Sequence, residues 1–192
     1  MDNTDDTSLH RCKDGSHTLY SSRFQQYYHN PNGAIAESRH VFFDTPGWMD
    51  SASPDEPFHL FEMGFGTGLN LLLLLESLGR MDHPPQIVYH AVEAYPLTQE
   101  QAAMLNYQEL LELPDNPTLP AGLFENLQPG KNHRQITPNL TLNLYIGRFD
   151  QYPGPPEPLG MIFFDAFSPD VNPALWNEDV FRKLAGWSAP DA

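Results

Sequence analysis

The sequence predicts an α/β fold with a mostly parallel sheet. Apolar stretches of strand length alternate along the chain with stretches of helix length, and this order requires crossover connections. The 192 residues are enough for one domain with a sizeable core. The 19 prolines and 13 glycines argue against a coiled coil or a helical bundle. We therefore expect parallel strands with helices on both faces of the sheet.

Four strands and three helices are expected in the second two thirds of the chain. A short apolar strand runs into a glycine cluster, and a leucine-rich helix follows it. Their strand–helix order makes the expected architecture Rossmann-like. The expected strands are 58–62, 86–92, 140–146 and 160–165, and the expected helices are 69–78, 98–113 and 177–187.

The remaining segments divide the chain further. Residues 1–17 are polar and acidic, which predicts a flexible arm that includes Cys12. Residues 18–57 are expected to form an N-terminal extension with short strands, because Asn30-Pro31-Asn32-Gly33 is a strong turn signal. Residues 58–192 form the expected Rossmann-like domain. Within it, 114–138 is expected to be a proline-rich connection.

Composition excludes several classes of protein. A single cysteine excludes a disulfide framework and a cysteine-based zinc module, and the eight histidines show no ligand spacing, so no metal is expected. The apolar run Leu71–Leu75 is too short to span a membrane, and 1–10 lacks the apolar core of a signal peptide, so a cytoplasmic protein is expected. The net charge of −15 disfavours broad electrostatic binding to nucleic acid.

A glycine loop indicates a nucleoside-containing cofactor. Gly64, Gly66 and Gly68 lie between an expected strand and an expected helix, where bare backbone lets a ligand approach closely. Glu93 follows at the end of the next strand, where a carboxylate accepts hydrogen bonds from the two hydroxyls of a ribose.

Spacing and charge favour S-adenosylmethionine over a dinucleotide. Dinucleotide loops read G-x-G-x-x-G, whereas this loop reads G-x-G-x-G and follows Glu62 directly. A carboxylate repels a pyrophosphate by about 1 kcal/mol or more at close range and attracts a sulfonium. A dinucleotide and a ligand-free glycine turn are the alternatives. The expected cofactor-binding residues are Glu62, Gly64, Phe65, Gly66, Thr67, Gly68, Asn70, Glu93 and Asp165.

Asp165 is the candidate catalytic residue. It ends the fourth strand, which in an open parallel sheet lies beside the first, and ligands bind outside the carboxyl ends of both. Methyl transfer needs a neutral nucleophile aimed at the methyl group, and a carboxylate can hold an amine and take its proton. The alternative is that Asp165 only caps the next turn.

Long motifs resemble the methyltransferase domain of the MnmC family, over about residues 27–181. The quoted motifs are Glu62-x-Gly64-Phe65-Gly66-Thr67-Gly68-Leu69-Asn70, Glu93-x-x-Pro96-Leu97 and Phe164-Asp165-x-Phe167-Ser168-Pro169-x-x-Asn172-Pro173-x-x-Trp176. The resemblance implies a class I S-adenosylmethionine methyltransferase that methylates the aminomethyl group of a tRNA wobble uridine, with Asp165 contacting the amine. The candidate substrate-binding residues are Tyr28, Arg39, His133, Arg134, Phe167 and Pro169.

Two departures from the family bear on the site and on the edge of the sheet. An acid usually follows the glycine after the third strand and faces the adenine, but Arg148 follows Gly147 here, and Asp150 is the alternative acid. The family continues beyond the last expected helix with further strands, so we expect the C-terminal strands to be lacking and the fourth strand to be a bare edge open to self-association. Two other functions stay open: a methyltransferase of the same fold acting on a small amine or a protein, and an inactive cofactor-binding fragment.

Overall fold

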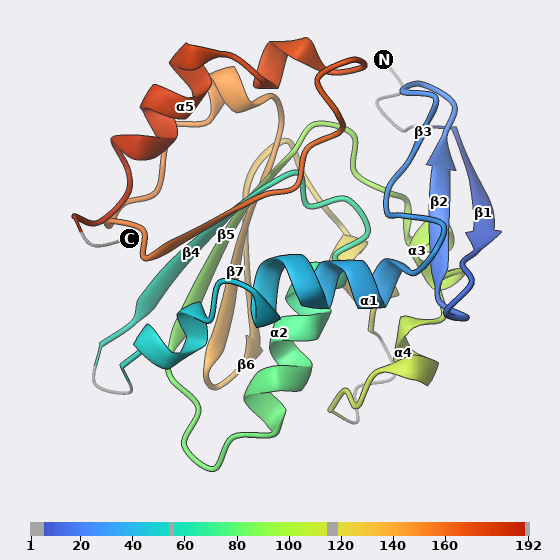
Figure 1. Cartoon of the computed structure of the whole chain (residues 1–192). Helices are drawn as coiled ribbons and strands as arrows, with labels where there is room; N and C mark the ends of the chain where they lie inside the picture. The colour runs from blue at the N-terminus through green and yellow to red at the C-terminus, as the bar shows by residue number, and fades with distance from the viewer. Residues whose placement is uncertain (1–5, 54–55, 115–118, 191–192) are drawn as a thin grey trace. The chain divides into compact units, whose positions relative to one another are not determined.

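The computed structural model describes residues 6–53, 56–114 and 119–190 (Figure 1). Contacts divide the chain into two compact units. The first unit consists of 1–51, 66–84 and 95–127, and the second consists of 52–65, 85–94 and 128–192. The units do not follow the expected domain boundaries, because the chain passes from one to the other several times. We describe each unit by itself.

The second unit is built on a five-stranded sheet with the order β6-β7-β5-β4-β8. Four neighbouring strands are parallel, as predicted, and β6 runs antiparallel to β7. The strands are β4 (Phe58–Met63), β5 (Ile87–Glu93), β6 (Gly130–Thr137), β7 (Leu140–Ile146) and β8 (Met161–Phe164). Together with the helices that separate these strands in the sequence, the sheet confirms the α/β, Rossmann-like prediction.

Strand β6 is a correction, because the sequence predicts a proline-rich connection there. Its half-buried and exposed residues alternate, but almost all of them are polar, so apolar periodicity could not reveal it. An edge strand needs main-chain hydrogen bonds on one side only, and β6 obtains them from β7, with an irregularity between Gln135 and Thr137.

Helix α5 (Glu178–Ala185) covers part of one face of the sheet, as Figure 1 shows. Its Val180 and Leu184 pack in a buried cluster with Phe61 and Met63 of β4. Asn177 caps the helix by accepting a hydrogen bond from the Val180 N–H, at 3.1 Å. The expected helix at 177–187 is therefore confirmed, with ends shifted by one or two residues.

Strand β8 lies at the end of the described sheet, as expected for the fourth predicted strand. The residues directly before β8 nevertheless form main-chain hydrogen bonds with the segment after α5. Leu159 donates its N–H to the Trp187 carbonyl and accepts a hydrogen bond from the Ala189 N–H, both at 2.8 Å. The segment after α5 thus runs parallel to the residues directly before β8.

A small antiparallel sheet in the first unit corrects the expected arm. Its strands are β1 (Thr7–Arg11), β2 (His17–Ser21) and β3 (Gln26–Tyr27). The arm prediction is thus wrong for residues 7–17, where Cys12 is buried, and residues 1–5 lie outside the described part. Polar composition concealed the hairpin, because β1 is mostly exposed and its pairing with β2 depends on the main chain.

The helices of the first unit are mostly short. Residues 34–44, expected within a region of short strands, form α1 (Ala34–Arg39) and a π-helical turn (His40–Asp44). Helix α2 (Leu69–Gly79) confirms the leucine-rich prediction, and nine of its 11 residues are buried. Among the described residues, we find no helix that is long and apolar enough to cross a membrane.

The expected helix at 98–113 is split into α3 (Gln99–Ala103) and α4 (Tyr107–Leu110). Thr98 begins α3 with a capping box. The break follows from a tertiary contact of Asn106, whose side chain accepts a hydrogen bond from the His17 N–H at 2.8 Å and donates one to the Gly15 carbonyl at 3.0 Å. The hairpin therefore fixes Asn106 outside a continuous helix.

Candidate functional site

The carboxyl ends of β4 and β8 are joined by main-chain contacts. The Asp165 N–H donates to the Met63 carbonyl at 3.0 Å, and the Gly64 N–H donates to the Val92 carbonyl of β5 at 3.1 Å. Gly64 has a φ of 89°, and a Cβ there would lie only 2.7 Å from the Asp165 carbonyl oxygen. Glycine is therefore required at this position by both conformation and space.

Two carboxylates at these strand ends interact with a buried tyrosine of β5. Glu62 is 1% exposed, and Tyr89 is fully buried on the neighbouring strand β5. Tyr89 pairs in register with Leu60, two residues before Glu62, so both side chains lie on the same face of the sheet. Burial raises the pKa of Tyr89 well above its ordinary value, and the carboxylates of Glu62 and Asp165 raise it further. The site is therefore acidic and suited to a cationic group.

Glu93 ends β5, the strand beside β4. Its carbonyl accepts a hydrogen bond from the Gly147 N–H at 2.8 Å, which ties the end of β5 to the loop after β7. In that loop Arg148 donates to both carboxylate oxygens of Asp150, at 3.0 and 3.2 Å. The hydrogen bond from Arg148 lowers the pKa of Asp150. Asp150, the alternative acid for the adenine, is thus exposed and forms an ion pair with Arg148, which stands where the family usually has an acid.

The second half of the glycine loop belongs to the first unit and is held by buried polar groups. Gly66 and Gly68 have φ angles of 53° and 75°, and Gly68 is the N-cap residue of α2. Thr67 Oγ1 lies 2.8 Å from His29 Nε2 and accepts a hydrogen bond from the Tyr107 hydroxyl at 3.3 Å. Burial lowers the pKa of His29 to about 4, so the ring is neutral at pH 7. The neutral Nε2 can accept the Thr67 hydroxyl proton.

Two predicted substrate residues of the first unit have structural contacts. A Cβ on Gly66 would lie 3.2 Å from Tyr28 Cδ1, so the Tyr28 ring packs against the bare backbone of the loop. Arg39 donates to the buried carboxylate of Glu76 on α2 at 2.5 Å. This ion pair gives Arg39 a structural role, and its contact with a substrate stays a prediction.

The predicted pair His133 and Arg134 lies on β6, where successive side chains point to opposite faces. His133 is exposed, and its Nδ1 lies 2.9 Å from Asn143 Oδ1 on β7. Phe167 and Pro169 lie in the loop after β8, next to Asp165. Trp176 fixes this loop, because its indole N–H donates to the Phe167 carbonyl at 2.8 Å.

The structure therefore assembles the predicted residues in two groups. Glu62, Gly64 and Asp165 come together in the second unit, with Glu93 at the end of the adjoining strand. Gly66 and Thr67 are joined by Tyr28 in the first unit, while Asn70 is buried on α2. Sequence reasoning missed Tyr89, His29 and Tyr107. Only Tyr89 gave a usable signal in the sequence, because the hydroxyl of a tyrosine within a buried apolar strand needs a polar partner.

A comparison with known protein families matches the C-terminal part of the chain. Residues 123–192 match the family described as S-adenosyl-L-methionine-dependent methyltransferase. The cofactor in this description is the one that the glycine loop and Glu62 predict.

The chain is also similar to MnmC proteins. Two curated relatives are named "tRNA 5-methylaminomethyl-2-thiouridine biosynthesis bifunctional protein MnmC". The relative from Leptospira borgpetersenii is 30% identical, and the match covers 87% of this chain and 26% of that protein. The relative from Delftia acidovorans is 32% identical, with 88% and 26% covered. The sequence resemblance to the MnmC family is thus confirmed, and the chain spans about a quarter of the length of these relatives.

A solved structure has the same fold. MNMC2 from Aquifex aeolicus superposes with a TM-score of 0.74 at 22% sequence identity, and the match covers 96% of this chain and 57% of that one. At this identity the similarity concerns the fold alone, which agrees with the Rossmann-like prediction.

Proposed function

We propose that the chain is an S-adenosylmethionine-dependent N-methyltransferase that converts the aminomethyl group of a tRNA wobble uridine to methylaminomethyl. One observation carries the proposal. Two carboxylates, Glu62 and Asp165, lie at the ends of neighbouring parallel strands and both act on the buried Tyr89 hydroxyl. An acidic strand end of this kind favours a cationic methyl donor and an amine acceptor. The names of the relatives support tRNA as the substrate.

The residues present fit this cofactor. Carboxylates at the strand ends attract its sulfonium and ammonium groups and would repel a pyrophosphate. In the proposal, Glu62 lies near these charges and Glu93 holds the ribose hydroxyls. The loop from Gly64 to Gly68, with Phe65, Thr67 and the nearby Asn70, holds the amino-acid half of the cofactor.

Asp165 acts on the acceptor in this proposal. Its carboxylate accepts a hydrogen bond from the amine and aims the nitrogen lone pair at the methyl carbon. When bound, S-adenosylmethionine would supply the methyl group, so that an N–C bond would form as the S–C bond breaks and a neutral thioether would leave with the bonding electron pair. The surplus proton leaves the nitrogen for Asp165. Phe167 and Pro169 shape the acceptor pocket, and Tyr28, Arg39, His133 and Arg134 contact the RNA.

The net charge of −15 favours a second candidate, a methyltransferase of the same fold that acts on a small amine. Salt separates the two candidates. Binding of tRNA weakens steeply with salt, because bound counterions are released from its phosphates, whereas turnover of a small amine does not. The tRNA proposal also implies a cytoplasmic protein.

The test is methyl transfer from labelled S-adenosylmethionine to tRNA that carries 5-aminomethyluridine at the wobble position. We expect Asp165→Asn to lower kcat at least about 100-fold while calorimetry shows nearly unchanged cofactor affinity. Asp170→Asn is the matched control, because Asp170 is an exposed acid in the same loop, and it should retain activity. A wild-type chain that methylates small amines but not this tRNA would contradict the proposal.

A further inference from the structure

A second concave site lies on the sheet of the second unit. The cavity has a volume of about 200 Å³ and is lined by strands β5, β7 and β6 and by the segment after β7. His90, one of its lining residues, pairs in register with Phe61, the neighbour of Glu62. Because successive side chains of a strand point to opposite faces, this cavity lies on the face opposite Glu62 and Tyr89. It is therefore distinct from the proposed methyl-transfer site.

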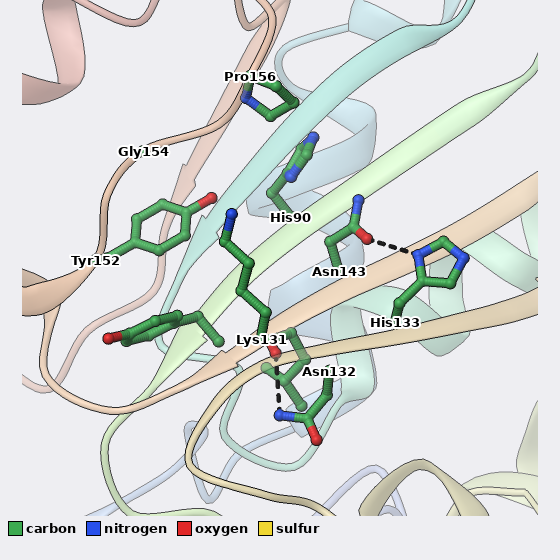
Figure 2. Close-up of a pocket in the computed structure, with 10 residues that line it drawn as sticks. His90, Lys131, Asn132, His133, Asn143, Tyr152, Gly154 and Pro156 are labelled. Atoms are coloured by element: carbon green, nitrogen blue, oxygen red, sulfur yellow. Dashed lines mark hydrogen bonds between the residues drawn. The ribbon is translucent and has the colours of Figure 1, made fainter.

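Hydrogen-bond donors from three directions surround the cavity, as Figure 2 shows. Lys131 extends its ammonium group from the edge strand β6. Asn143 uses its Oδ1 in the contact with His133 Nδ1 at 2.9 Å, so its two amide N–H groups remain for another partner. Tyr152 supplies a hydroxyl, and burial raises its pKa to about 12, so the hydroxyl keeps its proton at neutral pH.

The remaining histidine of the wall is neutral. Burial, together with smaller contributions from the nearby His59 and Lys131, lowers the pKa of His90 to about 4. His59 Nδ1 lies 3.1 Å from His90 Nε2, so the two rings share a hydrogen bond. The carboxylate of Glu157 interacts with His59, and no acid is among the described residues that line the cavity. Lys131 thus supplies a cation to this wall, beside the neutral donors of Asn143 and Tyr152.

The charge distribution in the sequence agrees with this arrangement. The chain has 25 acids and 10 bases, yet residues 126–149 contain no acid. The same stretch contains Lys131, Arg134 and Arg148. On β6, Lys131, His133 and Gln135 are exposed, and alternation places them on one face of the edge strand. The amide of Gln135 is engaged within the sheet, so Lys131 and His133 are the members of this row that face a ligand at the edge beside the cavity.

We propose that this cavity binds a backbone phosphate of the RNA substrate, with the Lys131 ammonium, the Asn143 amide and the Tyr152 hydroxyl as its donors. A phosphodiester carries one negative charge, which one ammonium neutralises, whereas a free phosphate monoester carries nearly two. The open edge strand lets a polynucleotide continue past the site, and Tyr145 places a second aromatic ring at the wall for a ribose or base. The choice of RNA rests on the proposed function.

The experiment measures binding of fluorescently labelled tRNA to the full chain by anisotropy over a series of salt concentrations. Lys131→Gln should weaken binding about 5- to 10-fold at low salt and reduce the slope of log K against log salt by about one. Asn143→Asp replaces the amide donor by a negatively charged carboxylate and keeps an acceptor for His133. It should therefore weaken tRNA binding more than Lys131→Gln does. Arg182→Gln is the control, because Arg182 is exposed on α5 and already paired with Glu178. It should leave affinity and slope unchanged.

Two results would overturn the site: variants of Lys131 and Asn143 that bind tRNA like the Arg182 control, or a wild-type chain that binds no tRNA. Tyr152→Phe, which keeps the packed ring and removes only the hydroxyl, gives a readout if Asn143→Asp does not fold. Titration with inorganic phosphate is the second arm of the experiment. If Lys131→Gln abolishes millimolar phosphate binding but leaves the affinity for tRNA unchanged, the cavity is a small-anion site and the RNA assignment is refuted. Binding of tRNA that depends on Lys131, without methyl transfer, refutes the proposed function alone.

Discussion

Lowering the pH from 7 to 5 should destabilise the fold through His29. The ring is buried against Thr67, and its pKa falls from 6.5 to about 4. In the unfolded chain His29 takes up a proton below pH 6.5, whereas in the folded chain it stays neutral until about pH 4. Protonation therefore favours the unfolded state in this window, and stability decreases as the pH falls. The two pKa values give a loss of about 2 kcal/mol between pH 7 and pH 5.

The assay is urea unfolding at both pH values for the wild type and for His29→Gln. Glutamine places an amide near the position of Nε2 but does not titrate, so the variant should lack this part of the pH dependence. His83→Gln, at an exposed position after α2, is the control and should lose stability with pH like the wild type. Equal losses for the wild type and His29→Gln would refute the account of His29 as a buried neutral ring that holds the glycine loop.

The remaining predictions concern backbone space and a buried ion pair. Gly64→Ala should destabilise the fold by about 2 kcal/mol or more, because its Cβ would lie 2.7 Å from the Asp165 carbonyl oxygen at a φ of 89°. Gly79→Ala, which meets no atom within 4 Å, should be neutral or stabilising in the same denaturation assay, and equal effects would count against the steric argument. Glu76→Gln should cost about 2 kcal/mol, because this carboxylate is 3% exposed and accepts from two arginines and from the Glu112 N–H. Glu112→Gln, at an exposed position, should cost much less, and a thermal scan that ranks them in reverse would contradict this prediction.

The parallel strands could be predicted from the sequence because each is apolar on its buried positions and ends at a chemical landmark. Glu62 and Glu93 lie at the ends of two such strands, Gly64 and Asp165 directly follow a strand, and the topology of a parallel sheet brings strand ends to one edge. The leucine-rich helix α2 was equally clear, because nearly every residue in it is buried.

Elements that depend on main-chain pairing or tertiary contacts could not be predicted. The strands β1 and β6 are polar, so hydrophobic periodicity gives no signal for them. The break between α3 and α4 depends on Asn106, whose partners lie about 90 residues away in the sequence. For the same reason, the contact between His29 and Thr67 was visible only in the structure.

The most direct test of the central claim is a calorimetric titration of the full chain with S-adenosylmethionine, and with NAD in parallel. The account predicts saturable one-to-one binding of S-adenosylmethionine and no binding of NAD. Glu62→Gln should weaken binding of the sulfonium cofactor about 10-fold or more, because the substitution removes a buried negative charge. Saturable binding of NAD with no binding of S-adenosylmethionine would contradict the claim that this acidic strand end holds a cationic methyl donor.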